Sequence, residues 1–219
     1  MKLLLTSNGL CNKSITNALK ELIDKPLPKS NLAFIPTAAN VEEGDKWWLI
    51  NDLQNCKNVG FQVVDIIDIS ALTREQWLPR LKSADVLLFG GGNTFHLIHW
   101  IRKSGLDKLL PNLLKTRVYV GISAGSMVTG PNIRLSESRK LYYLDIKNYQ
   151  DDAGLGLVNF TIRPHLNNNY FPNVRKENLA KLTKEIPEPI YALDDESAIK
   201  VDGKKIQIVS EGQYLAFNT

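Results

Sequence analysis

Ser123 stands at the centre of the motif in this sequence that points most directly to chemistry. Residues 121–125 are Gly-Ile-Ser-Ala-Gly, and they follow the apolar run 117–120. A strand that turns this sharply into a helix places the serine in a crowded backbone conformation, which requires small neighbours and projects the hydroxyl from the sheet edge. The pattern therefore indicates a serine nucleophile. The alternative is a glycine-rich turn that contains an incidental serine.

A serine hydroxyl needs a base to accept its proton, and histidine is the usual base near neutral pH. The chain has only three histidines, His96, His99 and His165. His165 follows an apolar run that Pro164 ends, so we predict it as the base at the edge of the sheet. His96 is the alternative base. His96 and His99 lie on one face of a predicted helix without a third ligand, so we predict no metal site.

An acidic side chain is expected to orient the histidine and to stabilise its protonated form. The residues alone leave two groups of candidates open. One group lies between Ser123 and His165, and the other follows a predicted strand near the end of the chain. The candidates are Glu137, Asp145, Asp151 and Asp152 in the first group, and Asp194, Asp195 and Glu196 in the second.

Backbone amides near the serine could stabilise a tetrahedral oxyanion. The amide of Ala124 directly follows the nucleophile. The glycine run 90–92 also ends a strand, so we predict Gly91, Gly92 and the adjacent Asn93 as oxyanion or substrate-binding residues. A phosphate-binding loop is the competing interpretation of this run. It is disfavoured because Phe95 occupies the position of the third glycine in Gly-x-Gly-x-x-Gly.

Composition excludes several other classes of protein. The 219 residues are 43% hydrophobic and carry a net charge of only +4, with the basic residues scattered, so we expect one globular domain over 1–219 and no nucleic-acid partner. No run approaches the roughly 20 apolar residues of a membrane span. Cys11 and Cys56 lack metal-ligand spacing, which favours free thiols and a cytoplasmic location. We predict no cofactor, and the sequence gives no oligomeric state.

Apolar runs alternate with amphipathic segments along the first half of the chain, which predicts a mostly parallel, doubly wound α/β sheet followed by short C-terminal strands. In such sheets ligands bind at the carboxyl ends of the strands. Trp47, Trp77 and Trp100 are predicted to be packing residues of the helices. The stretch 131–154 has no assigned structure. Predicted strands are 2–6, 31–36, 61–66, 85–89, 117–120, 157–163, 190–193, 198–201, 204–210 and 214–217; predicted helices are 14–22, 42–56, 73–82, 94–103, 106–114 and 175–184.

Three segments together resemble the peptidase E family, which includes aspartyl dipeptidases and cyanophycinases. They are Gly-Gly-Gly-Asn-Thr-Phe at 90–95, Gly-Ile-Ser-Ala-Gly-Ser at 121–126 and Leu-Val-Asn-Phe-Thr-Ile-Arg-Pro-His at 157–165. The likeness extends over most of the chain. It implies a fold similar to class I glutamine amidotransferases and a serine exopeptidase of the dipeptidase type, acting on short peptides such as Asp-X, with Ser123 as nucleophile and His165 as base.

The sequence departs from this family at the acidic residue. Ser138 occupies the position where an aspartyl dipeptidase would have its aspartate, and Glu137 precedes it. Because cyanophycinase-like members use a glutamate, the resemblance makes Glu137 the expected partner of His165. An aspartyl dipeptidase also needs a cation for the substrate carboxylate, and Arg134, Arg163, Arg175 and Lys176 are the candidates. A binding module without activity and a hydrolase of other amides or esters are the alternatives.

Overall fold

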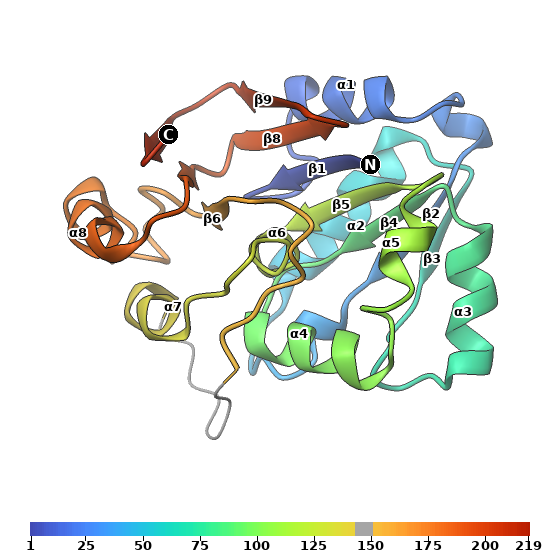
Figure 1. Cartoon of the computed structure of the whole chain (residues 1–219). Helices are drawn as coiled ribbons and strands as arrows, with labels where there is room; N and C mark the ends of the chain where they lie inside the picture. The colour runs from blue at the N-terminus through green and yellow to red at the C-terminus, as the bar shows by residue number, and fades with distance from the viewer. Residues whose placement is uncertain (143–150) are drawn as a thin grey trace.

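A computed structural model of the chain describes residues 1–142 and 151–219 (Figure 1). Its central sheet has the strand order β3-β2-β4-β5-β1-β8-β9. The first five strands in this order are parallel, and β8 and β9 are added antiparallel at the β1 edge. The strand bounds are β1 Lys2–Thr6, β2 Asn31–Ile35, β3 Val63–Ile66, β4 Val86–Phe89, β5 Val118–Ile122, β8 Ser197–Asp202 and β9 Lys205–Ser210.

A second, three-stranded sheet has the order β10-β7-β6. β6 (Thr161–Arg163) is parallel to β7 (Ile190–Leu193), and β10 (Tyr214–Phe217) pairs antiparallel with β7. The chain passes directly from β7 into β8 of the central sheet. The turn between these two strands therefore lies where the two sheets adjoin.

Helices cover both faces of the central sheet. Residues of α1 and α2 pack on one face, and residues of α3 to α6 pack on the other. In Figure 1, α7 and α8 lie to one side, next to the second sheet. The bounds are α1 Lys13–Leu22, α2 Trp47–Val59, α3 Arg74–Ser83, α4 Thr94–Lys103, α5 Leu110–Leu113, α6 Ala124–Met127, α7 Leu135–Tyr142 and α8 Lys176–Leu182, with 3₁₀ turns at Leu27–Lys29, Thr37–Ala39 and Thr183–Glu185.

The alternation of side chains along the strands explains why both faces are covered. In β1, Leu3 and Leu5 belong to one core cluster, and Leu4 belongs to the other. All three are fully buried. Because successive side chains of a strand point to opposite faces, a continuous apolar run needs a helix layer on each face.

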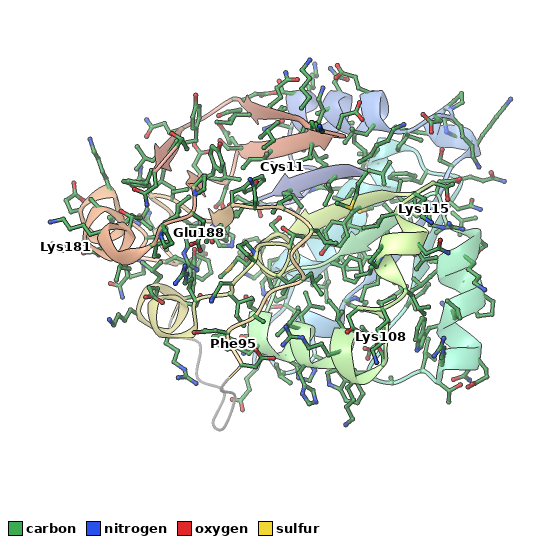
Figure 2. The ribbon with its side chains drawn as sticks, viewed as in Figure 1. Cys11, Phe95, Lys108, Lys115, Lys181 and Glu188 are labelled. Carbon is green, nitrogen blue, oxygen red and sulfur yellow. The ribbon has the colours of Figure 1, made fainter. Side chains whose placement is uncertain are left out.

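The basic residues are dispersed over the molecule, and Lys108, Lys115 and Lys181 are widely separated in Figure 2.

The mixed α/β architecture with a mostly parallel sheet and short C-terminal strands confirms the predicted fold class. Several predicted elements have different lengths. The helix predicted over 42–56 begins only at Trp47, and the one predicted over 106–114 is reduced to Leu110–Leu113, with Pro111 at its start. The strand predicted over 157–163 is limited to Thr161–Arg163. Within 131–154, the described part contains α7 and a bridge between Asn132 and Ala153. Asp145 lies outside the described residues.

Candidate active site

Ser123 occupies the turn between β5 and α6, and its backbone is strained. Its φ of 46° and ψ of −104° lie in a region that L residues seldom adopt. The Ser123 N–H donates to the Thr6 carbonyl oxygen at 3.1 Å, which ties the turn to β1. Glycine is required beside it, because a Cβ at Gly125 would lie 2.0 Å from the Phe89 carbonyl oxygen. The turn thus packs directly on β4 and presents the hydroxyl beyond the ends of the strands.

His165 contacts the Ser123 hydroxyl, as expected for a base at this sheet edge. Its Nε2 lies 2.9 Å from Ser123 Oγ. The residue has a positive φ of 64°, and its backbone N–H donates to Ser7 Oγ at 2.8 Å. Its ring stacks on Phe171, with the two ring centroids 4.3 Å apart. Packing and hydrogen bonding therefore fix both the backbone and the ring of His165.

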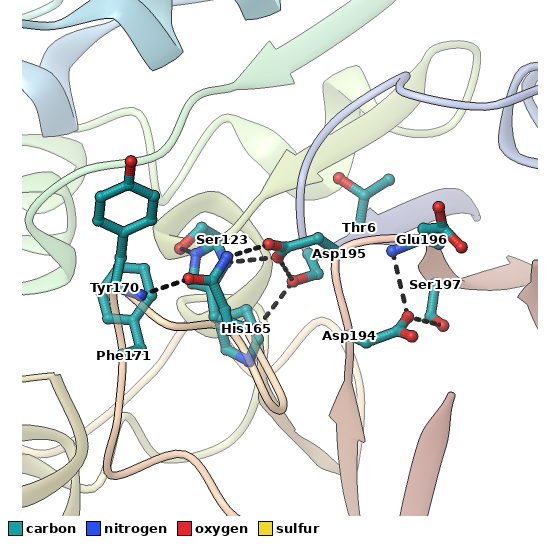
Figure 3. A network of polar contacts seen from close by, with 12 residues as sticks. Thr6, Ser123, His165, Tyr170, Phe171, Asp194, Asp195, Glu196 and Ser197 are labelled. Carbon is teal, nitrogen blue, oxygen red and sulfur yellow. Dashed lines mark hydrogen bonds and ion pairs between the residues drawn. The ribbon is translucent and has the colours of Figure 1, made fainter. Parts of the chain in front are cut away.

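Asp195 lies on the other side of the imidazole, in the turn between β7 and β8 (Figure 3). Its Oδ1 is 2.7 Å from His165 Nδ1 and accepts a hydrogen bond from Ser7 Oγ at 3.0 Å. Its Oδ2 accepts from the side-chain amide of Asn168. Burial alone would raise the pKa of Asp195, but the hydrogen bonds from His165, Asn168 and Ser7 outweigh it and lower the pKa below its ordinary value. The carboxylate is thereby kept ionised beside the ring.

The prediction of Glu137 as the partner of His165 is corrected by this geometry. Glu137 lies in α7, where its charge acts on the buried Arg163 guanidinium. Ser138 beside it is fully buried, and its hydroxyl donates to the Ile133 carbonyl oxygen and accepts from Arg163. Ser138 of α7 thus contacts Ile133 and Arg163, whereas His165 contacts Asp195. Counting residues from Ser123 therefore pointed to the wrong part of the chain.

The glycine run after β4 lies next to Ser123. The Gly90 N–H donates to the Ile35 carbonyl oxygen at 3.0 Å, and the Asn93 N–H donates to the Ala38 carbonyl oxygen at 2.8 Å. Between these anchors, a Cβ on Gly91 would be 3.6 Å from Ser123 Cβ. Gly92 needs glycine, because its φ is 117° and a Cβ would lie 2.4 Å from the Ala38 carbonyl oxygen. Within the described residues, the amides of Gly91, Gly92 and Ala124 donate to no backbone carbonyl.

Asn93 has a different position from the one predicted for a substrate-binding residue. Its side-chain oxygen accepts hydrogen bonds from the N–H groups of Phe95 and His96, so it caps the first turn of α4. It is buried and does not line the pocket at Ser123. Its contacts are those of a residue that holds the helix start in place.

A pocket of about 410 Å³ opens over Ser123, and it is rich in aromatic and acidic side chains. Trp47 belongs to its wall and is 52% exposed, which corrects its prediction as a packing residue. Trp77, by contrast, is fully buried as predicted. The lining residues are Ser7, Asn8, Glu42, Asp45, Trp47, Trp48, Asp52, Gly91, Gly92, Thr94, Ile122, Ser123, Met127, Tyr142, His165, Asn168, Tyr170, Phe171 and Asp195.

His96, the alternative base, does not line this pocket. It lies on α4 with its ring edge-on to Trp100, and burial lowers its pKa. Within the described part of the chain, no group of three or more His, Cys, Asp or Glu side chains could hold a metal ion.

None of the four predicted cation candidates lines the pocket. Arg134 forms an ion pair with Glu188 at 2.5 Å, and Arg163 is buried against Ser138. Arg175 donates to the carbonyl oxygens of Asn168, Phe171 and Val174. Lys176 begins α8 and, like the other three, is not part of the pocket wall.

Sequence reasoning missed Ser7 and Asn168, which both contact Asp195. Ser7 follows the last residue of β1, so the rule that ligands bind at the carboxyl ends of strands could have included it. Asn168 follows His165 closely in sequence, in a turn where the His165 carbonyl oxygen accepts the Asn168 N–H at 3.1 Å. No motif marks that turn in the sequence.

Residues 3–209 match the family model described as Peptidase family S51. The chain belongs to peptidase family S51. An uncharacterised peptidase of Listeria monocytogenes is 28% identical over 206 residues, which cover 89% of this chain and 96% of that protein. A peptidase E of Shewanella oneidensis is 33% identical over 143 residues, which cover 63% of this chain and 58% of that protein.

Solved structures agree with this membership of family S51. A crystal structure of a Listeria monocytogenes protein assigned as a peptidase E has a TM-score of 0.79 and 28% identity, and the match covers 96% of this chain and 98% of that one. A peptidase from an acI-B1 actinobacterium has a TM-score of 0.67 at 21% identity, which supports the fold alone. Membership of family S51 makes this chain a serine peptidase. None of its described helices combines the length and apolar character needed to span a bilayer.

Proposed function

We propose that the protein hydrolyses short peptides through an acyl-enzyme, with Ser123 as nucleophile, His165 as general base and Asp195 as the residue that orients His165. The observation that carries this proposal is the position of the imidazole, with Nε2 at 2.9 Å from the serine Oγ and Nδ1 at 2.7 Å from the carboxylate. Both distances are within the range for proton transfer and for a stable ring orientation.

The reaction follows from these contacts. His165 Nε2 accepts the hydroxyl proton while Ser123 Oγ attacks the carbonyl carbon of the peptide bond. The strained turn acts as a nucleophile elbow, and the amides of Ala124, Gly91 and Gly92 are the candidates that stabilise the oxyanion. The protonated imidazole then gives its proton to the leaving amine, and water hydrolyses the acyl-enzyme by the same base.

The pocket supports short peptides as substrates. Its volume of about 410 Å³ is at the lower end of the usual range for small-molecule sites, so it fits a few residues rather than a folded chain. Specificity for an amino-terminal aspartate would need a cation near the substrate carboxylate. Because no Lys or Arg is found among the described residues of the pocket wall, the proposal does not include that specificity.

A panel of free and blocked dipeptides and tripeptides tests the proposed function. We expect wild-type protein to release amino acids or dipeptides from some members, and Ser123→Ala to reduce kcat by several orders of magnitude with an unchanged melting temperature. Ser83→Ala is the matched control, because Ser83 is an exposed serine on α3.

A fluorophosphonate probe provides the second measurement, since it labels activated serines covalently. We expect labelling of wild type and of Ser83→Ala but not of Ser123→Ala. Hydrolysis or labelling that persists in Ser123→Ala would refute the assignment of the nucleophile. A protein that binds peptides but cleaves none would favour a binding module with this fold.

A further inference from the structure

Asp52 is a buried carboxylate in the wall of the pocket. It lies in α2, one helical turn after Trp48, so the two side chains share a helix face, and both line the pocket. Asp52 is only 4% exposed. A Cβ added to Gly9 would lie 2.9 Å from Asp52 Oδ1 and 3.0 Å from Ile122 Cδ1. Gly9 is therefore close both to Asp52 and to Ile122, the residue that immediately precedes Ser123.

No side chain in the described structure neutralises Asp52. Its carboxylate forms no hydrogen bond or ion pair with residues 1–142 or 151–219, and burial raises its pKa to about 7. The titratable groups that interact with it electrostatically are the thiols of Cys11 and Cys56, whose own pKa values are raised. Because a buried acid without a partner is costly to ionise, this position favours a cation that arrives with a ligand.

The rest of the pocket wall also favours binding of a cation. Glu42 and Asp45 contribute two more carboxylates, and no Lys or Arg occurs among the described lining residues. Trp47 and Tyr170 approach each other with ring centroids 6.1 Å apart, and both are largely exposed. Trp48 also lines the pocket. Because aromatic faces attract cations, the aromatic rings and the acidic side chains both favour binding of a positively charged group.

We propose that Asp52 binds a positively charged group of the peptide, either its α-ammonium terminus or a Lys or Arg side chain. This inference rests on the proposed function, since it names the substrate class of the same pocket. A site for a positively charged group would distinguish this protein from an enzyme that selects an acidic side chain. Asp52 acts in substrate binding and takes no part in proton transfer at Ser123.

The test is a calorimetric titration at neutral pH of the Ser123→Ala protein, which cannot turn over the ligand. Acetyl-Ala-norleucine-Ala carries no cation, acetyl-Ala-Lys-Ala carries one on the side chain, and Ala-norleucine-Ala carries one at the terminus. We expect one or both cationic peptides to bind about tenfold more tightly than the neutral peptide. The peptide that gains affinity identifies which cation is recognised.

Asp52→Asn, introduced into Ser123→Ala, is expected to remove this preference while leaving the affinity for the neutral peptide unchanged. Glu43→Gln in the same background is the matched control, because Glu43 is exposed and absent from the pocket wall. Asp52→Leu is a second variant, should Asp52→Asn fail to fold. A preference that survives both Asp52 variants, or the absence of any preference or binding, would overturn the proposal.

The same peptides separate this proposal from the proposed function. If wild-type protein hydrolyses neither these three peptides nor any member of the dipeptide and tripeptide panel while the Asp52-dependent preference persists, the peptidase assignment fails and the cation site is retained. If peptides are hydrolysed and kcat/KM is insensitive to both the cation and Asp52→Asn, the cation site fails alone.

Discussion

At the scale of single residues, Asp195 is distinguished from neighbouring acids by where its oxygens point. Asp194, one residue earlier, accepts hydrogen bonds from the Ser197 hydroxyl at 2.5 Å and from the Gln213 N–H. Asp194 therefore holds the connection between β9 and β10. Asp195 alone of this acidic cluster accepts from His165. The lowered pKa of Asp195 follows from the same hydrogen bonds, so its negative charge is available to an imidazolium at neutral pH.

Replacing Asp195 by asparagine tests this assignment against the one made from sequence. We expect Asp195→Asn to lower kcat by about 10³- to 10⁴-fold, because an amide cannot stabilise the imidazolium or fix its tautomer in the same way. Glu137→Gln is the matched comparison, since it removes an acid from α7, and we expect nearly wild-type kcat. Steady-state kinetics with thermal melting as a folding control distinguish the two. A loss in Glu137→Gln equal to that in Asp195→Asn would contradict the geometry.

Ser123 could be predicted from the sequence, whereas its acidic partner could not, and the difference has a physical reason. The serine sits in a turn that local sterics restrict to small neighbours, so the pattern of residues 121–125 carries the signal. The position of an acid next to His165 depends on tertiary packing between distant segments. Asp52 is a similar case, because only the packing of α2 shows that its carboxylate is buried in the pocket wall.

At the scale of elements, the turn between β5 and α6 depends on hydrogen bonds to β5 itself and to the end of β1. Tyr119 Oη donates to the Gly125 carbonyl oxygen at 2.7 Å, and the Ser126 hydroxyl donates to the Thr6 carbonyl oxygen at 2.7 Å. These bonds hold α6 at the ends of two strands. Strain at Ser123 is thus sustained by contacts that surround it.

Gly125→Ala should disrupt this element, because the new methyl group would overlap the Phe89 carbonyl oxygen at 2.0 Å. We expect the free energy of unfolding to fall by about 3 kcal/mol or more, with loss of fluorophosphonate labelling. Gly60→Ala is the comparison, because Gly60 has a φ of 95° and open space around it, so we expect about 1 kcal/mol from backbone strain alone. Urea denaturation measures both. Equal effects would show that overlap with β4 is relieved without cost.

Elements with a regular apolar pattern are among those that the sequence predicted best. β1 and α4 have the predicted bounds. The short apolar run at Leu3, Leu4 and Leu5 favours a buried strand, and the helical spacing of the apolar residues in α4 favours an amphipathic helix. The segment before α2 was predicted as helix but is irregular up to Lys46, and it contributes Glu42 and Asp45 to the pocket. Residues exposed to a pocket need no periodic apolar pattern, so sequence periodicity says little about them.

At the scale of the whole molecule, the candidate catalytic residues come from both sheets. Ser123 follows β5 of the central sheet, and His165 follows β6 of the second sheet. Asp195 lies in the turn that leads from β7 of the second sheet into β8 of the central one. Ser7, after β1, contacts both of the latter residues. The site can form only when the two sheets are packed together.

This arrangement predicts that activity and the helical structure are lost together in urea. We expect peptide hydrolysis and the far-UV circular dichroism signal to have the same midpoint, because residues 1–219 are proposed to unfold as one domain with a shared site. The segments that meet at the Ser123–His165 contact contribute to two core clusters: Ala124 and Ile162 belong to the central one, and Met127 and Leu166 belong to the one beside α7 and α8. If the second cluster opened first, His165 would leave Ser123 while the central sheet and its helices stayed folded. Activity would then disappear at a lower urea concentration than the dichroism signal, and the second sheet would have to be regarded as a separate folding unit.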